Sequence, residues 1–161
     1  MNYRPVTAIA LLFLLRLLPC SAMAQNDSIV VESIVTFYKY NDKDIKNADA
    51  INFIVQVTNN TTAPLPDLGA TSRAQHLNLY INDSINNPLS LYNGSENAYS
   101  KKTIDPGQKA TFDSGGWILN DMAGIIEKYG EEFTVQWEYM GVKSKRIQVN
   151  LKYKTLLTLN D

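Results

Sequence analysis

Alternation of apolar and polar side chains with a period of two is the feature that most constrains the fold of this 161-residue chain. The alternation is clearest at residues 51–58, 133–139 and 147–153. Successive side chains of a β-strand point to opposite faces, so this period predicts strands with one buried and one solvated face. The chain is therefore predicted to fold mainly as β-sheet.

Four further segments have weaker strand patterns, at residues 29–40, 77–81, 89–92 and 110–112, which brings the predicted strands to about seven. Residues rich in Asn, Asp, Gly and Pro separate them, at 41–47, 59–72, 82–88, 93–97, 105–107 and Gly141. Short strands with turn signals at this spacing predict an all-β antiparallel sandwich.

One segment has the period of a helix instead. Met122, Ile125, Ile126 and Tyr129 lie at i, i+3, i+4 and i+7, and Gly130 follows as a stop signal. We therefore expect a short helix directly before strand 133–139, the penultimate strand of the prediction.

The first residues have the pattern of an export signal. Arg4 precedes an apolar stretch at residues 8–18, and Ala22 and Ala24 give the A-x-A pattern of a signal peptidase site. The apolar stretch is shorter than the roughly 20 residues of a spanning helix. We expect residues 1–24 to be a signal peptide, residues 25–161 to be a periplasmic or extracellular domain, and no transmembrane segment to remain after cleavage.

Cys20 leaves a second interpretation of the same segment open. A thiol near the end of a signal is the site of lipidation in bacterial lipoproteins, although Pro19 stands where the motif that this resembles has a small residue. Without residues 1–24 the chain has no cysteine, whereas small secreted eukaryotic domains are usually rich in disulfides. The bacterial envelope is therefore the favoured location.

Composition excludes several classes of function. Lys and Arg number 15 against 16 Asp and Glu, so the chain lacks the basic surface that nucleic-acid binding requires. One cysteine cannot form an internal disulfide, and one histidine cannot supply a histidine-rich metal site. We expect neither a metal, a cofactor nor a nucleic-acid partner.

Two motifs resemble a known class of domain. The first is the segment 103–108, which contains Pro106-Gly107 and is followed by Phe112, and the second runs from Tyr129-Gly130 into the alternating segment 133–137. They resemble immunoglobulin-like domains of exported bacterial proteins and, more distantly, bacterial proteinase inhibitors with an immunoglobulin-like sandwich. The resemblance implies an immunoglobulin-like fold. Phe133 stands where antibody domains have their corner tyrosine, and no cysteine pair is present, so the chain departs from the antibody type.

Candidate catalytic groups do not form a recognisable set. His76 lacks a nucleophile in a G-x-S-x-G context, and a glycosidase would need two carboxylates across a cleft, for which Glu131, Glu132 and Glu138 are the candidates. Residues 41–49 offer oxygen ligands for Ca²⁺ but depart from the spacing of the calcium-binding loop. We expect a protein that is not an enzyme, and the calcium interpretation stays open.

The predicted function is binding to a protein or a glycan. Tyr92, Asn93 and Tyr99 surround a polar loop, and aromatic rings beside amides suit both kinds of contact. Loops 59–72 and 91–99 are the expected binding surface, and strand 29–40 is a second candidate because an edge strand can pair with another chain. An inhibitor or immunity-type protein that blocks an enzyme is the alternative.

Overall fold

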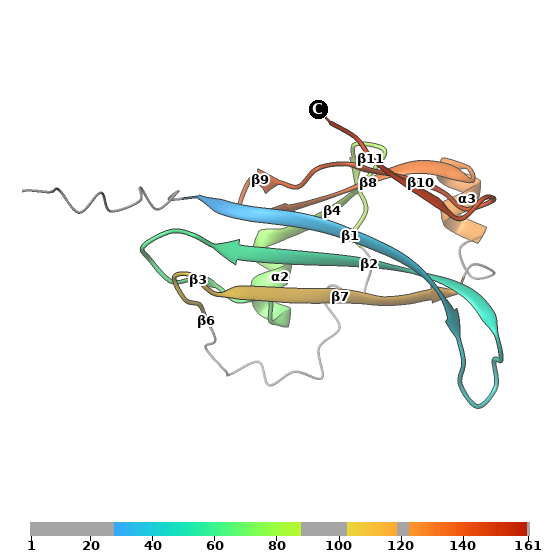
Figure 1. Cartoon of the computed structure of the whole chain (residues 1–161), viewed down its shortest axis with the longest axis horizontal. Coiled ribbons are helices and arrows are strands. Elements are labelled where there is room, and N and C mark those ends of the chain that lie inside the picture. Colours follow the sequence, from blue (N-terminus) through green and yellow to red (C-terminus); the bar gives the residue numbers. More distant parts are fainter. Residues whose placement is uncertain (1–27, 88–102, 119–122, 161) are drawn as a thin grey trace, which may run out of the picture.

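A computed structural model describes residues 28–87, 103–118 and 123–160 of the chain. These residues form two facing antiparallel sheets, a two-stranded ladder and two short helices (Figure 1). The elements are β1 (Ile29–Tyr40), β2 (Ala48–Asn59), β3 (Leu65–Pro66), α2 (Ala70–His76), β4 (Leu77–Ile81), β5 (Ser84–Ile85), β6 (Thr103–Ile104), β7 (Lys109–Ile118), α3 (Ala123–Tyr129), β8 (Glu132–Tyr139), β9 (Val142–Lys143), β10 (Ile147–Asn150) and β11 (Thr155–Thr158). The prediction of an all-β antiparallel sandwich is confirmed.

The three-stranded sheet has the order β1-β2-β7 and is built on one long hairpin. Every residue of β1 pairs with β2, from Ile29 opposite Asn59 to Tyr40 opposite Ala48. The connecting turn is fixed by Asp42, whose Oδ1 accepts the backbone N–H groups of Asp44 at 2.8 Å and Ile45 at 2.7 Å. The turn predicted at 41–47 is confirmed.

The six-stranded sheet has the order β11-β10-β8-β4-β5, and β9 pairs with β8. Two of its hairpins have two-residue turns, Asn82-Asp83 with φ values of 47° and 62°, and Met140-Gly141 with 49° and 81°. Positive φ at both central residues marks the turns whose twist matches that of the flanking strands. Both turns lie where the sequence predicts them.

The core lies between the two sheets and is made by alternate residues of each strand. Phe53 of β2 and Phe133 of β8 meet edge to face with ring centroids 6.4 Å apart. Phe112 and Trp137 meet in the same way at 6.4 Å, and Trp137 is completely buried. Trp137 lies on the buried face of the predicted strand 133–139, and Leu77, Leu79 and Ile81 form the buried face of the predicted strand 77–81.

Helix α2 covers one side of the sandwich and corrects the prediction of a continuous loop at residues 59–72. Its buried Arg73 places the guanidinium 4.1 Å from the centre of the Phe112 ring and donates to the Leu68 carbonyl at 2.5 Å. The helix lacks an apolar repeat and Gly69 gives it no side-chain cap, so neither sequence signal for a helix was present. His76 consequently ends α2 and does not begin the following strand.

The C-terminal strands also differ from the prediction. Strand 147–153 was predicted as continuous, but β10 ends at Asn150, whose Oδ1 accepts the Tyr153 N–H at 2.9 Å. Lys154 follows with φ at 51°, and the chain reverses into β11. Helix α3 precedes β8 as expected, yet β8 is not the penultimate strand because β9, β10 and β11 follow it.

The number of strands was underestimated. The described residues form eleven strands, four of which, β3, β5, β6 and β9, have two residues each. Ladders of this length leave no measurable alternation in a sequence. The predicted strand at 89–92 and the predicted turn at 93–97 lie outside the described residues.

Candidate functional site

The outer edge of β1 presents backbone groups that no strand of the described residues pairs with. The Asn60 N–H donates to the Ser28 carbonyl at 3.1 Å, which makes residues 28 and 60 a hydrogen-bonded pair of the β1–β2 ladder. Such pairs alternate along an antiparallel ladder, and the β1–β2 register is unbroken. Even-numbered residues of β1 therefore bond to β2. The free edge presents the backbone of Ile29, Val31, Ser33, Val35, Phe37 and Lys39.

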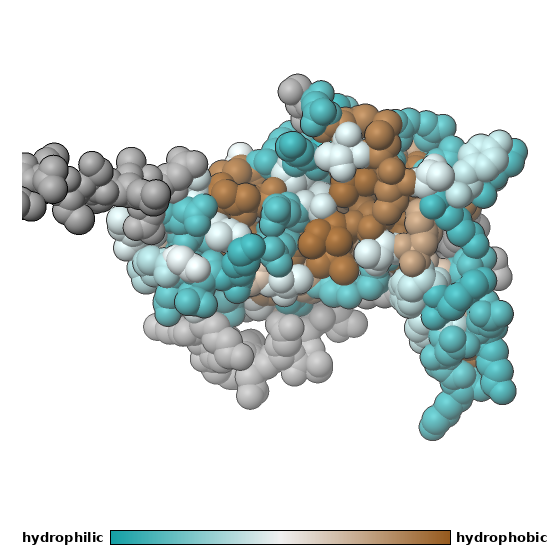
Figure 2. Space-filling model, viewed as in Figure 1, coloured by the Kyte–Doolittle hydropathy of each residue, from teal (hydrophilic) through white to brown (hydrophobic). Residues whose placement is uncertain are grey.

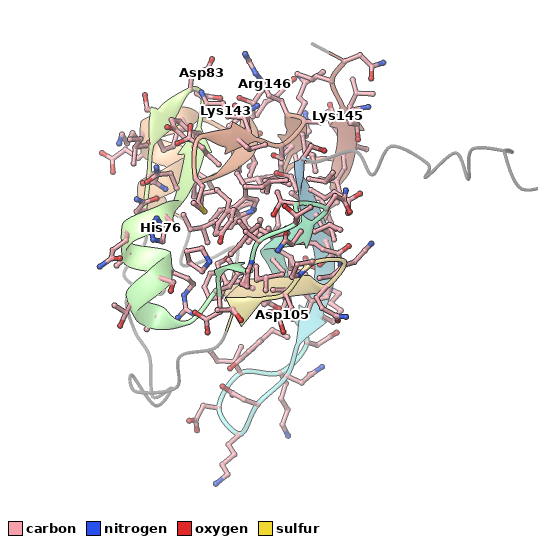
Figure 3. The ribbon with its side chains drawn as sticks, turned by 90° about the vertical axis from the view of Figure 1, so that its left-hand side faces the viewer. His76, Asp83, Asp105, Lys143, Lys145 and Arg146 are labelled. Atoms are coloured by element: carbon pink, nitrogen blue, oxygen red, sulfur yellow. The ribbon has the colours of Figure 1, made fainter. Side chains whose placement is uncertain are left out.

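Strands β10 and β11 extend beyond this edge. Val149 and Leu156 are opposite each other in the β10–β11 ladder, so their side chains lie on the same face of the sheet. Val149 is fully buried, whereas Leu156 is 41% exposed. The three-stranded sheet ends at β1 and does not reach β11, and the view along the strands shows the C-terminal strands lying farther out than β1 (Figure 3).

A shallow groove of 360 Å³ separates the two edges. It is lined by Val30, Val31, Glu32, Ser33, Lys145, Ile147 and Thr158. Val30 and Ile34 of β1 are 38% and 37% exposed, and Figure 2 shows apolar side chains on this face over β1 and over the C-terminal strands. We call the free edge of β1, the groove and β11 together the β1–β11 flank.

Two polar links hold the walls of the groove together. Near the groove, the Ser33 Oγ of β1 lies 2.7 Å from the Ser144 Oγ, in the segment between β9 and β10. At the other end of the flank, Asp49 receives Lys39 Nζ and Lys154 Nζ, each at 2.7 Å. The hydrogen bond from Lys154, followed by that from Lys39, lowers the pKa of Asp49 below 3.8. Because Lys154 belongs to the turn between β10 and β11, this ion pair ties the C-terminal hairpin to the β1–β2 hairpin.

The charges that line the groove are of both signs. Glu32 of β1 and Lys145, from the segment between β9 and β10, both line it. The flank thus combines a row of backbone donors and acceptors, aliphatic surface and one cation at the end where β1 begins. These are the groups that recognise an extended polypeptide.

A second polar cluster occupies the solvent face of the six-stranded sheet. Glu138 accepts a hydrogen bond from Tyr80 Oη at 3.1 Å and one from Asn78 Nδ2 at 3.4 Å, and Lys143 Nζ lies 4.5 Å from the centre of the Tyr80 ring. Burial, followed by the hydrogen bond to Glu138, raises the pKa of Tyr80. The hydrogen bonds and the cation–π contact link side chains of neighbouring strands, and such cross-strand pairs stabilise a sheet.

Charged groups gather next to that cluster at the β9–β10 connection. Arg146 pairs with Asp83 at 3.4 Å, and Figure 3 shows Lys143, Arg146 and Asp83 at the same end of the sheet. Lys145 lies apart from them, toward β11 (Figure 3). The Lys145 side chain is therefore placed to contact a molecule bound at the β1–β11 flank.

The residues predicted as a binding site, Tyr92, Asn93 and Tyr99, lie outside the described residues. Of the predicted loops, 59–72 contains β3 and the start of α2, and 91–99 is not described. The prediction that strand 29–40 lies at an edge of a sheet is confirmed by the strand order.

The candidate catalytic and metal groups are separated or engaged with other partners. Glu132 and Glu138 lie six residues apart on β8, a separation of about 20 Å, whereas glycosidase carboxylates lie within roughly 10 Å of each other. Asp42 uses both oxygens, because Oδ2 accepts the Tyr40 hydroxyl at 2.9 Å. Within the described ranges, no three His, Cys, Asp or Glu residues come together as a metal site.

Sequence reasoning missed the part of the flank formed by β11. The signal available was the run Thr155-Leu156-Leu157-Thr158, which follows Lys152, the solvent-exposed Tyr153 and Lys154. Its exposure depends on how far the opposite sheet extends, and no local pattern encodes that.

Comparison of the chain with protein-family models, curated proteins and solved structures gives no match. Among the helices of the described residues, none has the length and apolar character needed to cross a membrane.

Proposed function

We propose that the chain is an exported, non-catalytic binding protein whose partner is another protein that docks on the β1–β11 flank. The observation that carries the proposal is that, among the described residues, the twelve-residue edge of β1 has no neighbouring strand and the Leu156 side chain is exposed. A long edge with exposed aliphatic residues is a template for strand pairing, and natural proteins usually block such edges when no partner uses them. β1 contains no proline, and its charged residues are Glu32 and Lys39.

The chemistry of the flank favours a protein over a glycan. Glycan sites use aromatic rings as flat platforms, whereas the exposed large apolar residues of the flank are aliphatic, namely Val30, Ile34, Leu156 and Leu157. The N–H and C=O groups on the free edge of β1 recur at the spacing of a polypeptide backbone. The backbone of another extended chain can therefore form hydrogen bonds with them one after another.

Export is the second part of the proposal and is supported by the N-terminal sequence. Residues 1–24 have the charge, apolar stretch and A-x-A pattern of a cleaved signal, and the remaining chain has a formal charge of −3 and no cysteine. N-terminal sequencing of the protein from the producing cells is expected to begin at Gln25. A start at Met1 contradicts export with cleavage.

Site-specific photocrosslinking tests the docking surface. We expect p-benzoylphenylalanine at Leu156, on the inner face of β11, to capture a protein, and the same probe at Tyr80, on the solvent face of β4, to capture none. The captured protein is then identified, purified and titrated against the unlabelled full-length domain. Direct binding that the Leu156→Lys variant loses supports the proposal. Equal capture at both positions, or an identified protein that does not bind directly, contradicts it.

A further inference from the structure

We propose that the partner supplies one extended segment, which pairs antiparallel with the free edge of β1 and lies against the inner face of β11. This proposal rests on the proposed function above and names the form of the ligand. It predicts that the bound segment becomes a fourth strand of the three-stranded sheet.

The groove beside β1 is lined by residues 30–33 of that strand. An added strand lies about 4.8 Å from its neighbour, the same spacing that separates β10 from β11 in the facing sheet. Ile147 of β10 and Thr158 of β11 line the groove together with residues 30–33 of β1, so a strand added to β1 along this groove contacts the C-terminal strands. Its side chains on the inner face cover Leu156 and extend the core by one row.

A second copy of this chain does not fit the same place. Pairing of β1 with β1 of a second copy brings that copy's own β10 and β11 over the joined edge, where the first copy's β11 already extends. Two overhanging hairpins would then occupy one position. The geometry therefore selects a segment that arrives without a facing sheet.

The groove also defines the chemistry of the segment. Residues of the segment that face inward contact Ile147, Leu156 and Thr158, so they must be apolar, and the alternate residues face solvent. In the antiparallel orientation, which is the more stable pairing, the C-terminal end of the segment lies beside the start of β1. Lys145 and Glu32 both line the groove there, and an acidic side chain or a terminal carboxylate of the segment complements the Lys145 ammonium group.

The probe is a synthetic peptide of about ten residues, the length that spans β1, with alternating valine and threonine and a C-terminal aspartate. Two further peptides carry N-methyl groups at three alternate residues, one on each of the two alternating sets. An N-methyl group removes a backbone donor, and in strand pairing only one set faces β1. We expect one methylated peptide to bind about 100-fold more weakly, because three lost hydrogen bonds cost about 1 kcal/mol each, and the other to match the unmethylated peptide.

Equal binding of both methylated peptides overturns strand pairing. Absence of binding by the unmethylated peptide overturns the proposed ligand chemistry. If Leu156→Lys still abolishes binding of the crosslinked partner protein in either case, the proposed docking surface stands and only its mode of recognition is wrong. If Leu156→Lys leaves the partner protein bound, both proposals fail.

Matched variants of the full-length exported domain complete the test. Leu156 and Leu157 are adjacent and both exposed, but Leu156 faces the groove side and Leu157 the solvent side of β11. We expect Leu156→Lys to weaken the unmethylated peptide at least tenfold and Leu157→Lys to leave its affinity unchanged, with unfolding midpoints that show both variants to be folded. Equal effects of the two substitutions contradict the proposal.

Charge reversal tests the orientation. Lys145→Glu is expected to weaken the peptide that ends in aspartate and to strengthen a peptide that ends in an amidated lysine. The reversed preference places the C-terminal end of the ligand beside Lys145. A variant with unchanged preference contradicts the antiparallel orientation. Sedimentation of the free protein as a dimer that Leu156→Lys dissociates would identify a second copy as the occupant and overturn the proposal.

Discussion

The Ser33 Oγ and the Ser144 Oγ lie 2.7 Å apart, and both accept the backbone N–H of Trp137, at 3.2 Å and 3.0 Å. This contact joins β1 to the six-stranded sheet across 111 residues of sequence. It fixes the position of the free edge of β1 relative to β10, and so it sets the width of the groove. The groove is thus held open by interactions of the folded chain itself, and less conformational entropy is lost when a ligand enters it.

The first prediction concerns this pair of hydroxyls. Ser33→Ala and Ser144→Ala each leave Trp137 one acceptor, so each is expected to lower the free energy of unfolding by about 1 kcal/mol. The double variant leaves a buried N–H without an acceptor, which costs about 1–3 kcal/mol beyond the sum of the two. Urea unfolding of the three variants measures the difference. Strict additivity would show that the two serines do not share this donor.

The second prediction concerns the alkaline limit of stability. Burial, with the charge of Asp67 as a smaller cause, raises the pKa of Tyr139 from 10.0 to about 12, and its hydroxyl donates to the Pro66 carbonyl. The folded chain therefore keeps a proton that the unfolded chain loses near pH 10, so stability falls as the pH rises from 10 toward 12.

Tyr139→Phe keeps the buried ring and removes this proton. We expect it to cost about 1 kcal/mol at neutral pH and to flatten the loss of stability between pH 10 and 12, measured by urea unfolding across that range. Tyr153→Phe, at an exposed position, is the control and should do neither. An unchanged alkaline slope in Tyr139→Phe would contradict the assignment.

The third prediction concerns the ion pair at the far end of the flank. Because the pKa of Asp49 is lowered below 3.8 in the folded state, its contribution to stability is present above that pH and is lost as the pH falls through the lowered value. Asp49→Asn should therefore have a lower Tm than the parent at neutral pH, and the difference should close in acid. Lys154→Gln should behave in the same way, and Lys152→Gln, which changes a lysine outside this ion pair, should not. A difference in Tm that persists in acid would show that the substitution acts through packing.

The fourth prediction concerns the turn between β8 and β9. Gly141 has φ at +81° and open space where a Cβ would lie, so only the backbone conformation disfavours other residues. Gly141→Ala is expected to cost about 1 kcal/mol, and Gly141→Asn less, because asparagine tolerates the left-handed region. Thermal unfolding orders the two variants. Equal stability of Ala and Asn at this position would contradict the argument.

Strands with a long alternating pattern could be predicted from the sequence because burial of one face repeats every second residue. Residues 51–58 and 133–139 lie within β2 and β8, and residues 29–40 coincide with β1. Four ladders of two residues were too short to produce a period, and α2 has neither an apolar repeat nor a side-chain cap. These elements depend on contacts formed after the long strands have paired.

The candidate site was predictable in part. The strand at residues 29–40 was predictable from its pattern, and the strand order makes it an edge strand. The overhang of β11 depends on the relative extent of two sheets, and the pattern at residues 147–153 continues past the point where Asn150 forms a turn. Exposure of Leu156 is therefore a property of the assembled sandwich and leaves no mark on the local sequence.

Amide hydrogen exchange along β1 tests the central claim most directly. In the free protein, the N–H groups of the odd-numbered residues Val31, Val35 and Phe37 should exchange fast, and those of the even-numbered residues between them should be protected by β2. Addition of the alternating peptide should protect the odd-numbered set and leave the even-numbered set as it was. Odd-numbered amides that are already slow in the free protein, or that stay fast when the peptide is bound, would contradict the addition of a strand to this edge.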